Sequence, residues 1–341
     1  MHVGVYYRND DVRVEEMPVP EIGSGELLLE VSLCGICGSD VMEWYRVKKA
    51  PRVLGHEAVG VVNDVGEGVE KVEVGDRVFV SHHVPCGECR YCAKGAYTAC
   101  ETLHSINIDP GGFAEYVRVP AINVDYGIFP LPDNVTDEEG VFIEPLGCVV
   151  RGQERLDIRP GDTVLVLGSG VSGILHIQLA RHMGASKVLA TDIQEARLKY
   201  AEQFGADDAI DARGDVPGVV RKLNDGEAAD HVIVSTAALS AVKQAFESID
   251  DGGDILLFAP TPPGVELPLN LNDVWSRQIT LTTTYAAAPG DLETALGLIR
   301  SGSINFRDMV THRLSLWEIQ AGFKLVAEAR ESLKVVVNPH L

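Results

Sequence analysis

The sequence predicts an α/β fold in two parts, a β-rich first part followed by a doubly wound parallel sheet with helices on both faces. Short apolar runs separated by glycine and proline turns fill roughly the first 150 residues, as in a β-rich domain. Beyond them, apolar runs alternate with helical patterns, which is typical of a parallel sheet. The chain has 341 residues, enough for two domains of about 100–200 residues each.

In the first part, the runs at 26–32 and 58–62 predict strands, and the turn signals at 65–68 and 109–112 separate such runs. In the second part, strands are predicted over 163–167, 187–191, 209–211, 231–235, 255–258 and 279–284, with helices over 171–183, 195–204, 239–249 and 291–300. The last 50 or so residues read as strand 310–316, helix 317–329 and strand 334–337. Periodicity alone does not decide which part this tail joins.

The composition excludes several classes of function. Apolar residues make up 45% and charged residues 23%, as in a globular protein. The formal net charge of −21 repels nucleic acid and anionic membranes, so neither is an expected partner. No apolar run reaches the 18 or so residues of a membrane span, and the first residues lack a signal-peptide pattern. A cytoplasmic protein acting on small molecules is the expectation.

A glycine loop predicts a dinucleotide site. Gly168, Gly170 and Gly173 fit G-x-G-x-x-G, directly after a predicted strand and at the start of a helix that includes Val171. Such glycines permit a tight turn, a close approach of the pyrophosphate and close packing of helix on strand, as in the Rossmann fold. Asp192 ends the next strand about 20 residues on, where a carboxylate accepts hydrogen bonds from the ribose hydroxyls of NAD and repels a 2′-phosphate.

NAD is therefore the expected cofactor. Arg197 is a candidate to flank the adenosine, and an exposed helix charge is an equally good reading of it.

Four cysteines crowd into one short segment with the spacing C-x2-C-x2-C-x7-C, namely Cys86, Cys89, Cys92 and Cys100. Four thiolates saturate a tetrahedral zinc ion, so the predicted site is structural, with no position open to substrate. An iron–sulfur cluster also uses four cysteines, but it is disfavoured by the absence of a Cys-Pro ending. Disulfides are the remaining alternative and suit an oxidising compartment.

A second group of metal-ligand types is scattered along the first part. Cys37 lies in Cys-Gly-Ile-Cys-Gly-Ser-Asp, His56 and Glu57 lie in Gly-His-Glu, and Glu144 lies in Ile-Glu-Pro-Leu-Gly. Cysteine, histidine and carboxylate are zinc ligands when they are brought together, and three of them leave a coordination position open. Spacing alone does not show that they meet.

In this order, the motifs G-I-C-G-S-D, G-H-E, the four cysteines, E-P-L and G-x-G-x-x-G resemble those of the zinc-dependent medium-chain dehydrogenases, over essentially the whole chain. Among them, the chain is most similar to the sorbitol (polyol) and threonine dehydrogenase branch, which carries Glu-Pro where liver-type alcohol dehydrogenases place a cysteine ligand. The resemblance implies a GroES-like catalytic domain over 1–148, a Rossmann domain over 149–288, and a segment 289–341 that returns to the first domain. It also implies that the chemistry lies in the cleft between domains.

The resemblance further implies two zinc ions per subunit, one catalytic and one structural, together with NAD. Cys37 and His56 would be catalytic zinc ligands, and Glu57 and Glu144 would be the two carboxylates at the metal, one direct and one through water or only in some states. Ser39 would take the proton of the substrate. Cys34 and Cys148 match no ligand position and are expected in the core.

One departure concerns the proton route. Many relatives have a histidine five residues after the catalytic cysteine, and Met42 stands there in this chain. His83 holds the position of a substrate-facing histidine in the threonine branch, and His82 is the other candidate to face the active site. Packing or surface roles are the alternative for both.

The function expected from these residues is NAD-dependent oxidation of a secondary hydroxyl of a polyol, cyclitol or sugar derivative to a ketone. L-threonine 3-dehydrogenase and a simple alcohol dehydrogenase are the alternatives within the class. A non-catalytic nucleotide-binding protein, as some medium-chain relatives are, is a remote alternative, because this chain keeps the ligand motifs. Members of the family are usually homotetramers or homodimers, which is the expected assembly.

Overall fold

The computed structural model describes residues 1–341 and divides them into two compact units. Unit 1 comprises Met1–Gly147, Ala286–Gly302 and Phe306–Leu341, and unit 2 comprises Cys148–Tyr285 and Ser303–Asn305. Unit 1 is rich in strands and unit 2 contains a parallel sheet, so the predicted α/β fold class is confirmed. Each unit has its own hydrophobic core.

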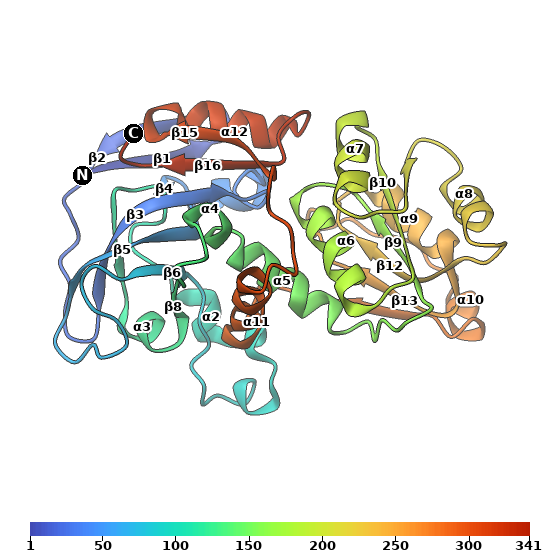
Figure 1. Ribbon diagram of the computed structural model, residues 1–341, viewed down its shortest axis with the longest axis horizontal. Helices are drawn as coiled ribbons and strands as arrows, with labels where there is room; N and C mark the ends of the chain where they lie inside the picture. Colours follow the sequence, from blue (N-terminus) through green and yellow to red (C-terminus); the bar gives the residue numbers. More distant parts are fainter. The chain divides into compact units, whose positions relative to one another are not determined.

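Unit 1 holds a seven-stranded sheet in the order β15-β16-β3-β5-β6-β8, with β7 paired to β3, and a three-stranded sheet in the order β2-β1-β4. The strands are β1 (His2–Arg8), β2 (Asp11–Glu16), β3 (Leu27–Ile36), β4 (Arg52–Val53), β5 (Glu57–Val65), β6 (Arg77–Ser81), β7 (Tyr116–Val119), β8 (Ile128–Pro130), β15 (Val310–Ser315) and β16 (Lys334–Asn338). Figure 1 shows β1, β15 and β16, from the two ends of the chain, close together beside α12.

Strand β3 is the centre of unit 1, because it pairs with β5, β7 and β16. Leu27, Leu29 and Val31 alternate along it and are completely buried, as period-2 side chains on the core face of a sheet should be. Strand β16 lies antiparallel to β3, with Val337 opposite Cys34. The C-terminal tail, which periodicity did not assign to either part, therefore pairs with the strand that ends just before Cys37.

The helices of unit 1 are short except near its end. They are α1 (Glu43–Arg46), α2 (Glu101–Ser105), α3 (Ala121–Gly127), α4 (Asp137–Gly140), α11 (Pro289–Arg300) and α12 (Ile319–Glu328), with single 3-10 turns η1 (Val47–Lys49), η2 (Cys92–Lys94), η3 (Tyr97–Ala99) and η4 (Leu316–Glu318). Helix α5 (Ile143–Gln153) runs across the division between the units. This helix was not predicted from the sequence; Pro145 lies in its first turn, where the missing backbone N–H has no helical hydrogen-bond partner to lose.

Unit 2 is a six-stranded parallel sheet in the order β11-β10-β9-β12-β13-β14. Its strands are β9 (Thr163–Leu167), β10 (Lys187–Asp192), β11 (Asp208–Asp211), β12 (Ala229–Val234), β13 (Ile249–Leu257) and β14 (Thr280–Thr283). Its helices are α6 (Val171–Met183), α7 (Glu195–Gln203), α8 (Val216–Leu223), α9 (Leu239–Ser248) and α10 (Leu271–Ser276). The strand order reverses at β9, which is the switch point of a doubly wound sheet.

The sequence located most of unit 2 because buried parallel strands are uniformly apolar. All five residues of β9 are buried, and helix α6 begins and ends where its pattern predicted. Helices α8 and α10 were not predicted. Both begin at a side-chain cap, since Asp215 accepts a hydrogen bond from the Gly218 backbone and Asn270 one from that of Asn272.

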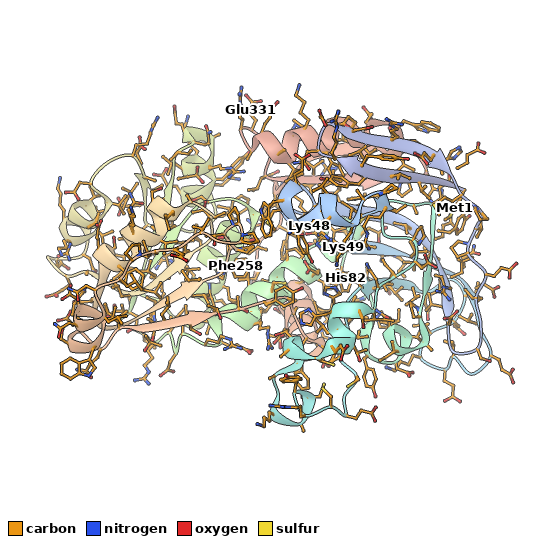
Figure 2. All side chains as sticks on the ribbon, turned by 180° about the vertical axis from the view of Figure 1, so that it is seen from behind. Met1, Lys48, Lys49, His82, Phe258 and Glu331 are labelled. Atoms are coloured by element: carbon orange, nitrogen blue, oxygen red, sulfur yellow. The ribbon has the colours of Figure 1, made fainter.

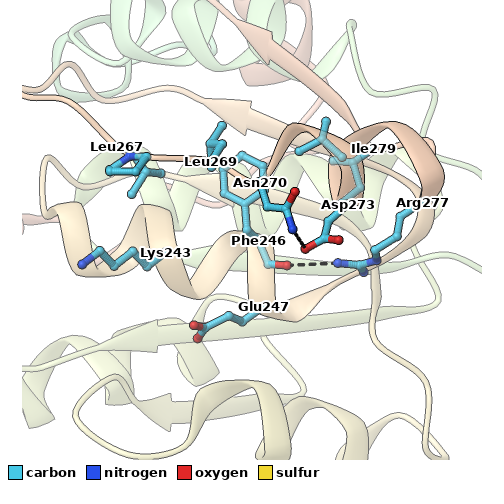
Figure 3. A pocket seen from close by; sticks show the side chains of 11 residues that line it. Lys243, Phe246, Glu247, Leu267, Leu269, Asn270, Asp273, Arg277 and Ile279 are labelled. Carbon is cyan, nitrogen blue, oxygen red and sulfur yellow. Dashed lines mark hydrogen bonds between the residues drawn. The ribbon is translucent and has the colours of Figure 1, made fainter.

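A pocket of about 280 Å³ opens between α9 and α10. Figure 3 shows it, with Arg277 donating to the backbone oxygen of Phe246 and Asn270 donating to Asp273 at 2.7 Å. None of its lining residues belongs to the glycine loop or to a predicted metal site.

No helix in the structure has the length and apolar character needed to cross a membrane.

Candidate metal and dinucleotide sites

The mixed donor group assembles in unit 1. Cys37 follows the end of β3, and His56 and Glu57 stand at the start of β5, the neighbouring antiparallel strand. Ligand atoms of all three lie within 4.8 Å of one another, and both His56, just before β5, and Glu57, its first residue, are buried. The pairing of β3 with β5 thus unites residues that are far apart in sequence. A thiolate, an imidazole and a carboxylate at this separation are a plausible zinc donor set.

Asp40 supports this group and was not singled out from the sequence. Its side chain is completely buried, with Oδ1 at 3.4 Å from His56 Nδ1, and Oδ2 accepts a hydrogen bond from the Cys37 backbone. A carboxylate on one ring nitrogen orients a histidine so that the other nitrogen can bind a metal. Burial alone would lower the pKa of His56, but Asp40 and Cys37 raise it well above its usual value in the metal-free chain.

Lys334 is a second residue that sequence reasoning missed. It lies on β16, is 1% exposed, and donates a hydrogen bond from Nζ to Oε2 of Glu57, which is also 1% exposed. Burial would lower the pKa of Lys334, but Glu57, Cys37 and Glu144 raise it. No signal in the sequence indicated this role, because Lys334 lies in the C-terminal tail and no local pattern connects that tail to the Gly-His-Glu motif.

Glu144 lies in the first turn of α5 and is buried. Its charge contributes to the raised pKa of Lys334, so it belongs to the same electrostatic environment as Glu57. The order in which the two carboxylates serve a metal stays a prediction.

Ser39 lies in the turn after Cys37, and its hydroxyl is held by Arg46. The guanidinium donates from Nη2 to Ser39 Oγ at 2.9 Å and from Nε to the Ser39 backbone oxygen at 2.9 Å. The same Nη2 lies 3.3 Å from Oδ1 of Asp40. Because arginine is always protonated, it can donate to Ser39 but cannot receive a proton from it. Met42 carries no group that could do so either.

His82 and His83 follow β6 and stack on each other, with ring centroids 3.7 Å apart. His82 also packs on the ring of His56, with centroids 4.8 Å apart, so His82 is the histidine that contacts the donor group directly. Burial lowers the pKa of His82 well below its usual value and that of His83 to about 3, with neighbouring positive groups adding to both effects. Both are therefore neutral at pH 7, and each has a buried Nδ1 without a hydrogen-bond partner.

The four-cysteine lobe closes as the spacing predicted. The sulfur atoms of Cys89 and Cys92 are 3.5 Å apart, those of Cys100 and Cys86 are 3.6 Å apart, and those of Cys86 and Cys92 are 4.0 Å apart. A tetrahedron with zinc–sulfur bonds of about 2.3 Å has edges of about 3.8 Å, so these distances fit zinc.

Backbone groups prepare this lobe for thiolates. Cys86 and Cys89 donate backbone hydrogen bonds to the sulfur atoms of Cys100 and Cys86. Although burial alone would raise the pKa of Cys100, backbone donors lower it to about 6. All seven cysteines are reduced, so the disulfide alternative is not observed.

The glycine loop lies in unit 2 between β9 and α6, with Gly170 as the N-cap and Val171 as the first residue of the helix. Gly168 has φ +98°, and a Cβ on Gly173 would lie 1.9 Å from the backbone oxygen of Gly168. Both positions therefore require glycine, for the turn and for close packing respectively. The free N–H groups at the start of α6 are suited to a pyrophosphate.

Asp192 ends β10 beside this loop. Its Oδ2 accepts from the Ser169 backbone at 2.9 Å and its Oδ1 from the Gln194 backbone at 2.9 Å, which fixes the carboxylate. Arg197 on α7 approaches it, with Nη1 at 3.9 Å from Oδ2, and its Nε is buried without a partner. Arg197 is thus near the loop rather than out in solvent.

Comparisons with known proteins identify the family. The description "Alcohol dehydrogenase GroES-like domain" matches residues 23–133, and "Zinc-binding dehydrogenase" matches residues 172–301. The chain belongs to this family, the zinc-dependent medium-chain dehydrogenases, as its motifs indicated. It is an oxidoreductase that acts on CH–OH groups with zinc and NAD.

Individual relatives cover nearly the whole chain. "Probable D-xylulose reductase A" of Aspergillus clavatus is 33% identical over 341 aligned positions, 96% of this chain and 93% of the relative. "L-threonine 3-dehydrogenase" of Chelativorans sp. is 33% identical over 333 positions, 95% of this chain and 94% of the relative. Among solved structures, an alcohol dehydrogenase of Escherichia coli CFT073 complexed with NADH has a TM-score of 0.88 at 27% identity, covering 99% of both chains.

Proposed function

We propose that the protein oxidises a secondary hydroxyl of a polyol, cyclitol or sugar derivative to a ketone, with NAD as hydride acceptor. The observation that carries the proposal is the assembly of Cys37, His56 and Glu57 within 4.8 Å, supported by buried Asp40 and Lys334. Such a donor set leaves a zinc ion one position for a hydroxyl oxygen. The similarity to a D-xylulose reductase supports a polyol or ketose as the substrate pair.

In this proposal, Cys37 and His56 hold the catalytic zinc, and Glu57 and Glu144 are the two carboxylates at the metal. When bound, zinc lowers the pKa of the substrate hydroxyl as a Lewis acid, and NAD supplies the hydride acceptor. Lys334 offsets the charge of buried Glu57, so the pocket holds a carboxylate without an uncompensated negative charge.

Ser39 is the proposed first acceptor of the substrate proton. Its hydroxyl oxygen accepts a hydrogen bond from Arg46, so one lone pair remains to accept the substrate proton and the hydroxyl's own proton can pass on. Because neither Arg46 nor Met42 can take that proton, water is the proposed next carrier. This differs from the histidine relay of many relatives.

His82 and His83 have the role of neutral hydrogen-bonding groups in this scheme. Each has an unpartnered buried Nδ1, which suits a polar substrate with several hydroxyl groups. A pKa of about 3 makes His83 a weak base, so we assign it to positioning the substrate rather than to accepting its proton.

In unit 2, the loop of Gly168, Gly170 and Gly173 with Val171 is proposed to hold the pyrophosphate of NAD. Asp192 is proposed to bind the adenosine ribose hydroxyls through its remaining lone pairs, and Arg197 to flank the adenosine.

The similarity to an L-threonine 3-dehydrogenase makes a 3-hydroxy amino acid the second candidate substrate. A panel of D-sorbitol, xylitol, myo-inositol, D-glucose, L-threonine and ethanol, with NADH absorbance as the readout, separates the two. We expect turnover with polyols or cyclitols and NAD. Turnover with L-threonine alone would replace the substrate, and no turnover of any hydroxyl compound with NAD or NADP would refute the proposal.

We also propose a homodimer or homotetramer. Strand β14 is an edge of the unit 2 sheet; Leu281 in it is 44% exposed, and Leu271 and Trp275 on the preceding helix α10 are 74% and 78% exposed. Exposed apolar side chains along a free sheet edge favour a protein partner. Seven reduced cysteines agree with a cytoplasmic location, and light scattering measures the assembly.

A further inference from the structure

Three basic residues of unit 1 follow Tyr45 closely in the sequence, and none of them has an acidic partner. Lys48 and Lys49 are exposed on the turn η1, and Arg52 is half-buried in β4. Lys49 Nζ is 5.8 Å from the centre of the Tyr45 ring, and Arg52 is within electrostatic range of both Tyr45 and Arg46. None of the three forms an ion pair with an Asp or Glu side chain. We call Lys48, Lys49 and Arg52 the basic cluster.

Such a cluster is unexpected in this chain, whose formal net charge is −21. Several arginines elsewhere pair closely with carboxylates, as Arg13, Arg77 and Arg277 do at 2.6 Å. Acidic residues outnumber basic ones, so an unpaired group of cations does not follow from composition. The basic cluster is thus a positively charged region in a protein whose net charge is negative.

The unpaired positive charge of Arg52 is energetically unfavourable, because this side chain is half-buried. A half-buried guanidinium loses hydration, and here its burial and the charge of Arg46 both lower the pKa of Arg52. A purely structural arginine in such a place is normally offset by a carboxylate. Asp40 is in electrostatic range but is already engaged by Arg46 and His56. An anionic ligand would supply the missing charge.

The basic cluster is connected to the proposed metal site through Tyr45 and Arg46. Arg46 contacts Asp40 at 3.3 Å and stacks on Tyr45 at 4.9 Å, and Asp40 contacts His56 at 3.4 Å. The charge of Lys49 also reaches His83, whose pKa it helps to lower. Figure 2 marks Lys48, Lys49 and His82, which come from η1 and from the loop after β6. A molecule bound at the metal donors therefore has positive charge within its reach.

We propose that the physiological substrate is a polyol or sugar derivative with an anionic oxygen group, a phosphate or a carboxylate, which Lys48, Lys49 and Arg52 bind. The inference rests on the proposed function, because it names the substrate class of that same site. Arginine matches both anions with two parallel hydrogen bonds, and lysine adds a mobile point charge. The pyrophosphate of NAD is assigned to the glycine loop of unit 2, so the cluster is left for the substrate.

The first experiment compares matched substrates on the zinc-loaded full-length protein. The sets are D-sorbitol with D-sorbitol 6-phosphate, and D-glucose with D-glucose 6-phosphate and D-gluconate. We expect kcat/KM for at least one charged member to exceed that of its neutral parent by about tenfold or more, mainly through KM, since one well-made charged contact is worth about 1.4 kcal/mol or more. The phosphate and carboxylate arms show which anion is used.

The second experiment uses the double variant Lys49→Gln with Arg52→Gln, which keeps side-chain length and removes the charges. We expect the ratio of kcat/KM for charged over neutral substrate to fall about tenfold or more, with KM for NAD unchanged. Lys222→Gln, an exposed lysine on α8 in unit 2, is the matched control and should leave the ratio unchanged. A rise in KM for NAD instead of a fall in the ratio would overturn the assignment.

Calorimetric binding of inorganic phosphate gives a readout that needs no turnover. We expect wild type and Lys222→Gln to bind phosphate, and the double variant to bind it at least about tenfold more weakly. Equal phosphate binding by wild type and the double variant would overturn the inference. If neutral polyols are oxidised without preference for charged ones, only this inference fails; if no hydroxyl compound reacts while phosphate binds the cluster, the proposed function fails and the anion site stands.

Discussion

The two groups of metal donors in unit 1 are built in opposite ways. The four cysteines come from one short segment, and backbone N–H groups provide the hydrogen bonds to their sulfur atoms. Cys37, His56 and Glu57 come from two strands, and buried charged side chains surround them: Asp40 on His56 and Lys334 on Glu57. The cysteine lobe is a local structure, whereas the mixed group depends on the sheet around it.

The two sites therefore depend on different parts of the chain for their stability. A ligand set within one loop needs little from the rest of the chain, and a metal with four thiolates is saturated. A mixed set with buried charges depends on partners far away in sequence, because each unpaired charge would be costly. Four measurements test this contrast.

The largest expected effect comes from removing one ligand from each group. His56→Ala should leave one zinc per subunit and reduce turnover by about 10³-fold or more, because the Lewis acid contributes several kcal/mol. Cys86→Ser should lose the other zinc and lower the melting temperature, while folded protein retains turnover. Metal analysis with NADH absorbance measures both. Two zincs and normal turnover in His56→Ala would contradict the assignment of the mixed group.

Lys334→Met tests the buried charge pair. It leaves the Glu57 carboxylate buried without its cation, and we expect a loss of about 3–5 kcal/mol in the free energy of unfolding by urea. The double variant with Glu57→Gln should recover much of that loss. Lys324→Met, which breaks an exposed pair with Glu328, is the control and should cost less than about 1 kcal/mol. Equal effects of the two lysine variants would show that the buried pair contributes no more to the free energy of unfolding than the exposed pair.

Asp40→Asn tests the support of His56. The amide no longer offers a charged acceptor to the ring, so zinc affinity of the mixed group should fall about 10–100-fold, as measured by competition with a chelator. The zinc of the cysteine lobe should be retained, which provides an internal control. Asp137→Asn, which breaks the ion pair with Arg77, should change neither zinc. Loss of both zincs from Asp40→Asn would indicate general unfolding instead.

His176 shows what burial does to a histidine that lacks a carboxylate. Burial lowers its pKa to about 3, and its Nδ1 lies 3.0 Å from the amide of Gln153. Unfolded histidine has a pKa of about 6.5, so the unfolded state binds the extra proton between these values. The stabilisation is therefore complete above about pH 6.5 and is lost as the pH falls, by about 1.4 kcal/mol per pH unit.

His176→Leu removes this term, so the difference in unfolding free energy between wild type and variant should shrink between pH 6.5 and pH 5. Urea unfolding at several pH values measures the difference. A difference independent of pH would mean that His176 takes up its proton equally in the folded and unfolded protein, which contradicts a lowered pKa in the folded state.

Elements with a local signal were the predictable ones. Strand β9 and helix α6 have the predicted bounds, because a continuous apolar run and a glycine loop are formed by neighbouring residues in the sequence. The spacing of the four cysteines likewise anticipated a compact tetrahedral group. By contrast, α10 has no buried residue, so no apolar pattern was available to predict it.

The candidate site was predictable in its ligand types but not in their surroundings. Asp40 lies three residues after Cys37 and is ordinary in sequence; only its complete burial against His56 shows its role. The sequence assigned no role to Arg46, and only its contact with Ser39 Oγ in the fold shows one. The signal that could have found Asp40 is its presence in the Cys-Gly-Ser-Asp motif itself.

By itself, the sequence determined the fold class, the glycine loop and the chemical types of the metal donors, because these depend on side-chain identity and short-range spacing. Only the tertiary structure decided that Lys334 neutralises Glu57, that Arg46 donates to the hydroxyl of Ser39, and that Lys49 lies near the ring of Tyr45. For Lys334 and Glu57, the physical reason is that β16 and β5 lie in the same sheet, which brings together residues separated by most of the chain. Electrostatic and hydrogen-bond energies depend on those distances in space, and not on distances along the sequence.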